Sequence, residues 1–138
     1  MLTQFFFFTI AVSAATAIHE VAHLAVAKLL RLRVVKFQLG IVEIVRFRCL
    51  DTTYMLGAVW ISGSTLVVHD MASNNKPKKI AVYSAGIVTN LLSAALAHCV
   101  VQHPLTELFV HTSLIIAAAN ALPFGQRDGA QLYRLLRR

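Results

Sequence analysis

The residues most capable of chemistry are His19, Glu20 and His23, which form an HExxH sequence inside the apolar stretch 17–30 (AIHEVAHLAVAKLL). Residues four apart share one face of a helix, so both imidazoles can reach one metal ion while Glu20 beside them takes a proton from water. Zinc suits this arrangement, because it lowers the pKa of bound water and polarises a peptide carbonyl. The alternative is a pair of core histidines with a snorkelling glutamate. Glu20 lies roughly 15 Å from the basic end of such a helix, which is too far for comfortable snorkelling.

A third metal ligand is expected, because a catalytic zinc site generally has three protein ligands and one open position. Asp128 is the best candidate among only six acidic residues, since it follows an apolar run that Pro123 and Gly125 interrupt. These two residues predict a broken helix, whose open backbone is tolerated at membrane depth only where it lines a cavity in the protein. The alternative is a helix that ends in a solvated turn, with Asp128 as a cap.

A buried amide is expected at Asn90, one turn after Ala85 and Gly86, whose small size lets helices approach closely. The Asn90 side chain could hydrogen-bond a substrate carbonyl or its developing oxyanion. An interhelical hydrogen bond accounts for the same residue equally well, so both roles stay open.

The elements that must position these residues are long apolar helices. The chain has 138 residues, of which 57% are hydrophobic and 14% charged, and this composition favours a membrane protein. Three stretches can cross a bilayer core of about 30 Å. We predict spans at about residues 2–30, 80–101 and 105–124, the last continuing as a broken helix to 138.

Residues 31–79 are more polar than the predicted spans, and their pattern predicts a small sheet. The run 34–48 alternates in places between apolar and polar residues, so that Lys36 and Gln38 fall opposite Val35, Phe37 and Leu39. The run 57–68 is rich in β-branched residues. The expected fold is therefore a mostly α polytopic membrane protein. It forms a single domain over residues 1–138, with a small β-sheet or hairpin between the first two helices.

The net charge of +7 is explained by membrane topology rather than by nucleic acid. The lysines and arginines fall into two groups, one from the end of the first span to the start of the second and one after the third. The positive-inside rule then puts the N-terminus outside and both basic groups in the cytoplasm, and we expect the membrane to be a bacterial cell membrane. No nucleic acid is expected as a partner, because no basic surface is interleaved with aromatic residues.

Two smaller features bear on the same topology. The residues FFFFTIAVSAATA resemble the core of a signal peptide, but no basic residue precedes them and the apolar run continues past Ala17, so we do not expect cleavage. Cys49 and Cys99 fall near opposite faces of the membrane in this scheme, and we expect no disulfide between them.

Taken in order, three motifs resemble those of the site-2 protease family of intramembrane zinc metalloproteases. The family pattern is HExxH, then A-G-P-x-x-N, then N-x-x-P-x-x-x-x-D-G, and it is matched by residues 19–23, 85–90 and 120–129. The chain departs from the pattern at Ile87, where the family has proline, and at Gly125, where a second proline is common.

The resemblance implies that His19, His23 and Asp128 bind one zinc ion and that Glu20 is the general base. Arg127 directly precedes the aspartate and could pair with it in competition with the metal.

The resemblance also implies that Asn90 assists at the substrate carbonyl, and we assign Asn120 to substrate binding with it. A three-helix core would then cleave the transmembrane segment of a partner protein. The strands between Val34 and Val68 would hold the unwound substrate by strand addition.

The sequence thus predicts a zinc metalloendopeptidase that acts on a membrane-protein substrate and contacts membrane lipid. One alternative is a catalytically inactive relative that binds membrane helices as a regulator or chaperone and has no need of Glu20. Another is a structural membrane subunit in which zinc occupies a closed site.

Overall fold

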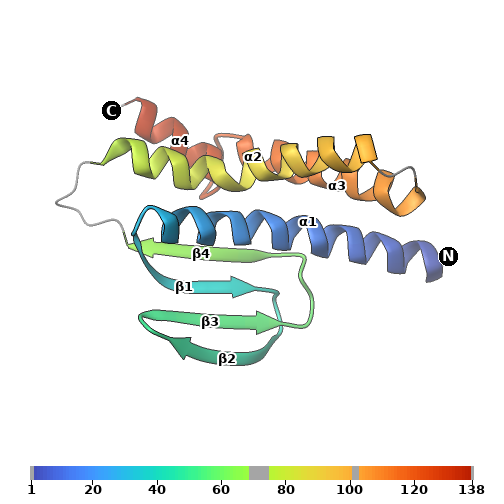
Figure 1. Ribbon diagram of the computed structural model, residues 1–138, viewed down its shortest axis with the longest axis horizontal. Helices are drawn as coiled ribbons and strands as arrows, with labels where there is room; N and C mark the ends of the chain where they lie inside the picture. The colour runs from blue at the N-terminus through green and yellow to red at the C-terminus, as the bar shows by residue number, and fades with distance from the viewer. Residues whose placement is uncertain (1, 69–74, 101–102, 138) are drawn as a thin grey trace.

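A helical layer and a four-stranded sheet lie on either side of the first helix in the computed structural model, which describes residues 2–68, 75–100 and 103–137 (Figure 1). The elements in chain order are α1 (Leu2–Leu29), β1 (Arg33–Leu39), β2 (Glu43–Cys49), β3 (Thr52–Gly57), β4 (Gly63–Val68), α2 (Lys76–Val100), α3 (Pro104–Ala121) and α4 (Asp128–Leu136). The mostly helical architecture agrees with the prediction from the sequence.

The helices pack through small side chains. Ala15 and Ala27 of α1 and Ala117 of α3 are almost completely buried, whereas Leu92 of α2 and Ile115 of α3 are exposed. Small residues inside and large apolar residues outside are typical of helices surrounded by lipid, because close backbone approach rather than the hydrophobic effect drives their association.

Two helices of the described residues, α1 and α2, are long and apolar enough to cross a membrane, which is consistent with a membrane protein. The third predicted span is not confirmed. The 18 residues of α3 reach about 27 Å, slightly less than a bilayer core. α3 ends at Ala121 rather than at Phe124, because a residue that precedes proline avoids the helical conformation. Leu122, before Pro123, is accordingly extended, with φ −66° and ψ 137°.

The chain turns sharply between α3 and α4. Gly125 lies in this turn with φ +69°, a left-handed conformation that glycine adopts without a steric penalty. Asp128 is the first residue of α4. Pro123 and Gly125 therefore interrupt the helix, as the sequence predicted.

The predicted small sheet between the first two long helices is present, and it has four strands in the order β2-β3-β1-β4. β1 is parallel to β3, and the other two pairs are antiparallel. The predicted run 34–48 divides at Gly40, where φ is +94°. The strand predicted over residues 57–68 is shorter, because only residues 63–68 form β4. Gly57 instead ends β3, a strand that no pattern in the sequence predicted.

The alternation expected along β1 is shifted at its start. Phe37 and Leu39 are buried, as their spacing predicts, but Val34 is buried in place of Val35. The register against β4 slips between Val34 and Lys36. A β-bulge adds one residue to a strand, so the side chains that face the core shift by one position across it. Val34 and Phe37 therefore lie on the same face although they are three residues apart.

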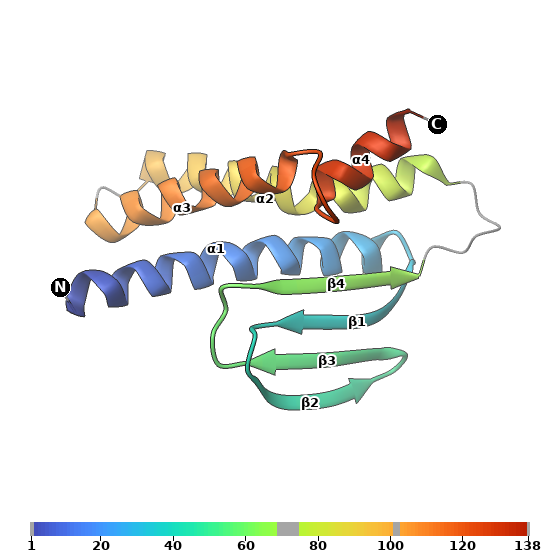
Figure 2. The same cartoon turned by 180° about the vertical axis from the view of Figure 1, so that it is seen from behind.

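β4 is the edge of the sheet next to α1, as both views show (Figures 1 and 2). The hydroxyl of Thr65 donates a hydrogen bond to the backbone carbonyl of Glu20 at 3.3 Å. This contact fixes the edge of the sheet beside the HExxH turn of α1.

Candidate metal centre

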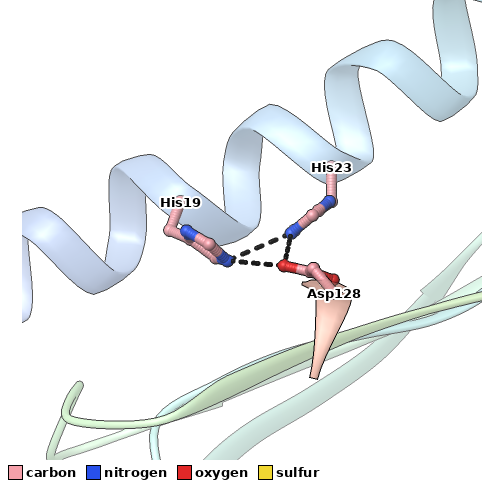
Figure 3. Close-up of side chains that lie close together, drawn as sticks. All are labelled: His19, His23 and Asp128. Carbon is pink, nitrogen blue, oxygen red and sulfur yellow. Dashed lines mark hydrogen bonds and ion pairs between the residues drawn. The ribbon is translucent and has the colours of Figure 1, made fainter. Parts of the chain in front are cut away.

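His19, His23 and Asp128 converge from α1 and from the start of α4 (Figure 3). The Nε2 atoms of the two histidines are 3.1 Å apart, and Oδ2 of Asp128 lies 3.1 Å from each of them. Both histidines are buried, and the Asp128 side chain is only 18% exposed. Asp128 therefore faces the histidines instead of capping its helix towards solvent.

These three donor atoms fit a zinc ion. Nδ1 of His23 donates to the carbonyl oxygen of Val82 at 2.7 Å, so the neutral ring carries its lone pair on Nε2. His23 then directs the lone pair of Nε2 at the carboxylate of Asp128, which is unfavourable unless a positive charge lies between them. Ligands about 2.0–2.1 Å from a tetrahedral zinc are about 3.3 Å from one another, close to the separations seen here. Two imidazoles and one carboxylate also form a known ligand set of catalytic zinc sites with an open position.

Arg127 does not compete for the carboxylate of Asp128. Its Nη1 atom donates to the carbonyl oxygen of Ala119 at 2.8 Å, and no ion pair between described residues includes it.

Two glycines allow the backbone to approach the ligands. A Cβ atom on Gly86 of α2 would lie 2.5 Å from Cε1 of His19 and 2.6 Å from Nε2 of His23, well inside van der Waals contact. A Cβ atom on Gly129 of α4 would overlap the carbonyl group of Ala121 at the end of α3. Gly86 thus lets α2 rest against both imidazole rings, and Gly129 lets α4 pack where Asp128 reaches them.

Glu20 lies between the two histidines in the sequence, but its side chain is directed to the sheet. Oε2 of Glu20 accepts a hydrogen bond from the hydroxyl of Thr65 at 3.2 Å. A Cβ atom on Gly63 would overlap the Cγ atom of Glu20, so the edge of β4 lies directly against this side chain. Thr65 and Gly63 were not among the predicted site residues, and their distance from Glu20 in the sequence leaves no pattern that would reveal them.

Comparison with known proteins places the chain in a family. A family model described as peptidase family M50 matches residues 7–105, more than half of the chain. The chain belongs to peptidase family M50. This membership confirms the resemblance to the site-2 protease family. No curated protein matches the chain significantly. The family match includes His19, Glu20, His23 and Asn90 but ends before Asp128, so the structure is what joins the aspartate to the histidines.

In the part of the M50 peptidase chain that the structure describes, Glu20 lies where two cavities adjoin. The larger, of about 630 Å³, is lined by the three candidate ligands and by residues 63–67 of β4. The smaller, of about 360 Å³, extends towards the N-terminal half of α1 and is lined by Val12 and Thr16. Both cavities are lined by His19, Glu20, Gly63, Asn120 and Arg127.

The two asparagines of the predicted site differ in their surroundings. Asn120 lines both cavities, and its Nδ2 atom donates to the carbonyl oxygen of Ile116 at 3.0 Å in its own helix. Asn90 is completely buried on α2 and lines neither cavity. The structure thus brings Asn120, but not Asn90, to the space where a substrate could lie.

Proposed function

We propose that this M50 peptidase chain is an intramembrane zinc metalloprotease that cleaves a peptide bond in or near a transmembrane segment of another protein. Family membership supports a peptidase of this kind. The convergence of two imidazole nitrogens and one carboxylate oxygen at mutual distances of 3.1 Å is the observation that carries the proposal.

In this proposal His19, His23 and Asp128 hold one zinc ion, which when bound supplies an electrophile and lowers the pKa of a water molecule. Glu20 acts as the general base. Glu20 lines both cavities, and the hydrogen bond from Thr65 would hold its carboxylate beside the space where water and a peptide bond would meet. Glu20 then returns the proton to the leaving amine.

The substrate is held in an extended form along β4. A peptide in a helix is protected by its own hydrogen bonds, so the segment to be cut must first unwind. β4 pairs with β1 on one side, and its residues 63–67 line the cavity that contains the ligands. An added strand would therefore place its backbone beside Glu20, and Asn120 is available to bind a substrate carbonyl.

The proposed topology has α1, α2 and α3 spanning the membrane, with the N-terminus outside and the C-terminal helix in the cytoplasm. The separation of basic residues supports this orientation. Glu20 is nine residues from the C-terminal end of α1, which places the site about 14 Å from the cytoplasmic end of that helix. Water would enter from that side through the larger cavity.

The decisive experiment measures cleavage and zinc content in the same preparations. Glu20→Gln is expected to lower cleavage of a co-expressed transmembrane substrate about 100- to 10,000-fold while one zinc ion per chain is retained. Asp128→Ala is expected to lose the zinc as well. Persistent product formation by Glu20→Gln would refute the mechanism.

The two alternatives give different results. A catalytically inactive relative would bind membrane helices equally well with and without Glu20 and would yield no product from the wild type. A closed structural zinc site would not bind a hydroxamate inhibitor, because it has no open coordination position.

A further inference from the structure

The two candidate histidine ligands differ in what their second ring nitrogen contacts. Nδ1 of His23 donates to the carbonyl oxygen of Val82 at 2.7 Å. Nδ1 of His19 is buried and has no hydrogen-bond partner among the described residues. Figure 3 shows this nitrogen on the side of the ring that faces away from Asp128. A ligand histidine almost always donates its second N–H to a carboxylate, a carbonyl or water, so His19 lacks an expected acceptor.

Asn90, in the neighbouring helix α2, offers a suitable acceptor. Its side chain is completely buried, and neither Oδ1 nor Nδ2 has a hydrogen-bond partner among the described residues. An unpaired buried polar group costs about 1–3 kcal/mol, so each half of this amide needs a partner. Because Asn90 lines neither cavity, a substrate is not that partner in the observed arrangement.

The packing of α2 on α1 brings Asn90 and His19 to the same interface. Asn90 follows Gly86 by four residues and so lies one turn further along the same face of α2. A Cβ atom on Gly86 would be 2.5 Å from Cε1 of His19, the carbon between the two ring nitrogens, and 2.6 Å from its Nε2, so this turn of α2 packs against the His19 ring. α1 and α2 run in opposite directions, so Asn90 lies nearer than Gly86 to the N-terminal end of α1 (Figure 1). Helical side chains lean towards the N-terminus, which tilts the His19 ring in that direction.

We propose that Asn90 is a positioning residue for the metal site: its Oδ1 atom accepts a hydrogen bond from Nδ1–H of His19. This bond fixes the tautomer of His19 and leaves the lone pair of Nε2 directed at the metal, as the Val82 carbonyl does for His23. The proposal rests on the zinc site of the proposed function, but it does not depend on cleavage of any substrate.

The test compares zinc affinity in variants of the full chain, measured by competition with a chromophoric chelator. Asn90→Leu removes the acceptor at similar volume and is expected to lower zinc affinity about 10- to 100-fold. Asn90→Asp retains an acceptor and is expected to bind zinc at least as tightly as wild type. Thr112→Val is the matched control, since Thr112 is also buried but its hydroxyl donates to Leu108 in its own helix. This variant should bind zinc normally.

A spectroscopic readout separates positioning from general loss of packing. In the zinc-loaded wild type, ¹⁵N NMR of labelled histidines should show a slowly exchanging Nδ1–H on His19, with a nuclear Overhauser contact to the Asn90 amide. Asn90→Leu should lose that resonance while the Nδ1–H of His23 stays unchanged.

Ser113 of α3 is the rival partner for Asn90, because it is also completely buried and its hydroxyl has no hydrogen-bond partner among the described residues. Three results would overturn the proposal: unchanged zinc affinity in Asn90→Leu, equal losses in the Leu and Asp variants, or a contact from the Asn90 amide only to Ser113. If Asn90→Leu does not fold, the wild-type contact alone decides. Failure of the wild type to bind zinc would instead refute the proposed function.

Discussion

Replacing Gly86 with alanine should weaken zinc binding, because the added methyl group would meet the two histidines proposed as zinc ligands. It would lie 2.5 Å from Cε1 of His19 and 2.6 Å from Nε2 of both His19 and His23. Carbon atoms in ordinary contact are about 3.5–4.0 Å apart, so the rings or α2 must move by about 1 Å. Zinc–ligand distances tolerate deviations of only about 0.2 Å.

The size of the effect follows from the cost of overpacking. An extra methyl group in a tightly packed region costs about 1–3 kcal/mol. If this cost falls on the geometry of the two imidazoles, zinc affinity decreases about 5- to 150-fold, since 1.4 kcal/mol corresponds to a factor of ten. Cleavage should decrease in parallel at limiting zinc.

Zinc affinity of Gly86→Ala is measured by chelator competition, with circular dichroism to confirm that the helices form. Val88→Ala is the control, because Val88 lies two residues further along α2 and is 47% exposed. This control should bind zinc like the wild type. A folded Gly86→Ala protein with zinc affinity within twofold of wild type would show that α2 does not press on the ligands.

Two further variants test the contacts around the site. Thr65→Val removes the hydroxyl that donates to Glu20 Oε2 at 3.2 Å, and it should slow cleavage about tenfold without loss of zinc, because a hydrogen bond to a charged group contributes about 1.5–3 kcal/mol. An unchanged cleavage rate would show that the Thr65 hydroxyl does not contribute to the reaction. Thr52→Val deletes a buried hydroxyl that accepts from Lys28 Nζ and donates to the carbonyl of Val34, both at 2.8 Å, and it should destabilise the fold by about 1–3 kcal/mol. Thermal unfolding checks this, and an unchanged Tm would contradict it.

The sequence was sufficient to predict what depends on local pattern. HExxH on a helix brings His19 and His23 to one face by geometry alone. Pro123 and Gly125 predict the break after the third helix, although the predicted span ran to residue 124 and α3 ends at Ala121. Asp128 was predicted as the third ligand from its place after the break and from the motif it shares with site-2 proteases. The structure brings its carboxylate to both rings.

What the sequence could not predict depends on contacts between distant elements. β3 pairs in parallel with β1, and a parallel pair leaves no turn signal between its strands. The bulge after Val34 reverses the alternation from which facing residues are predicted. The position of Arg127 also needed the structure: adjacency suggested a pair with Asp128, but the turn directs its guanidinium to the end of α3.

His23 and Asp128 are separated by 105 residues along the chain. An ion bound to both therefore acts as a cross-link between distant parts of the polypeptide, much as a disulfide does. By loop-closure entropy, a cross-link over about 100 residues is worth about 4.7 kcal/mol. If zinc is bound as proposed, its loss would stop cleavage and would also let the protein unfold more readily and be degraded sooner. The lifetime of the protein in the cell would then depend on the supply of zinc.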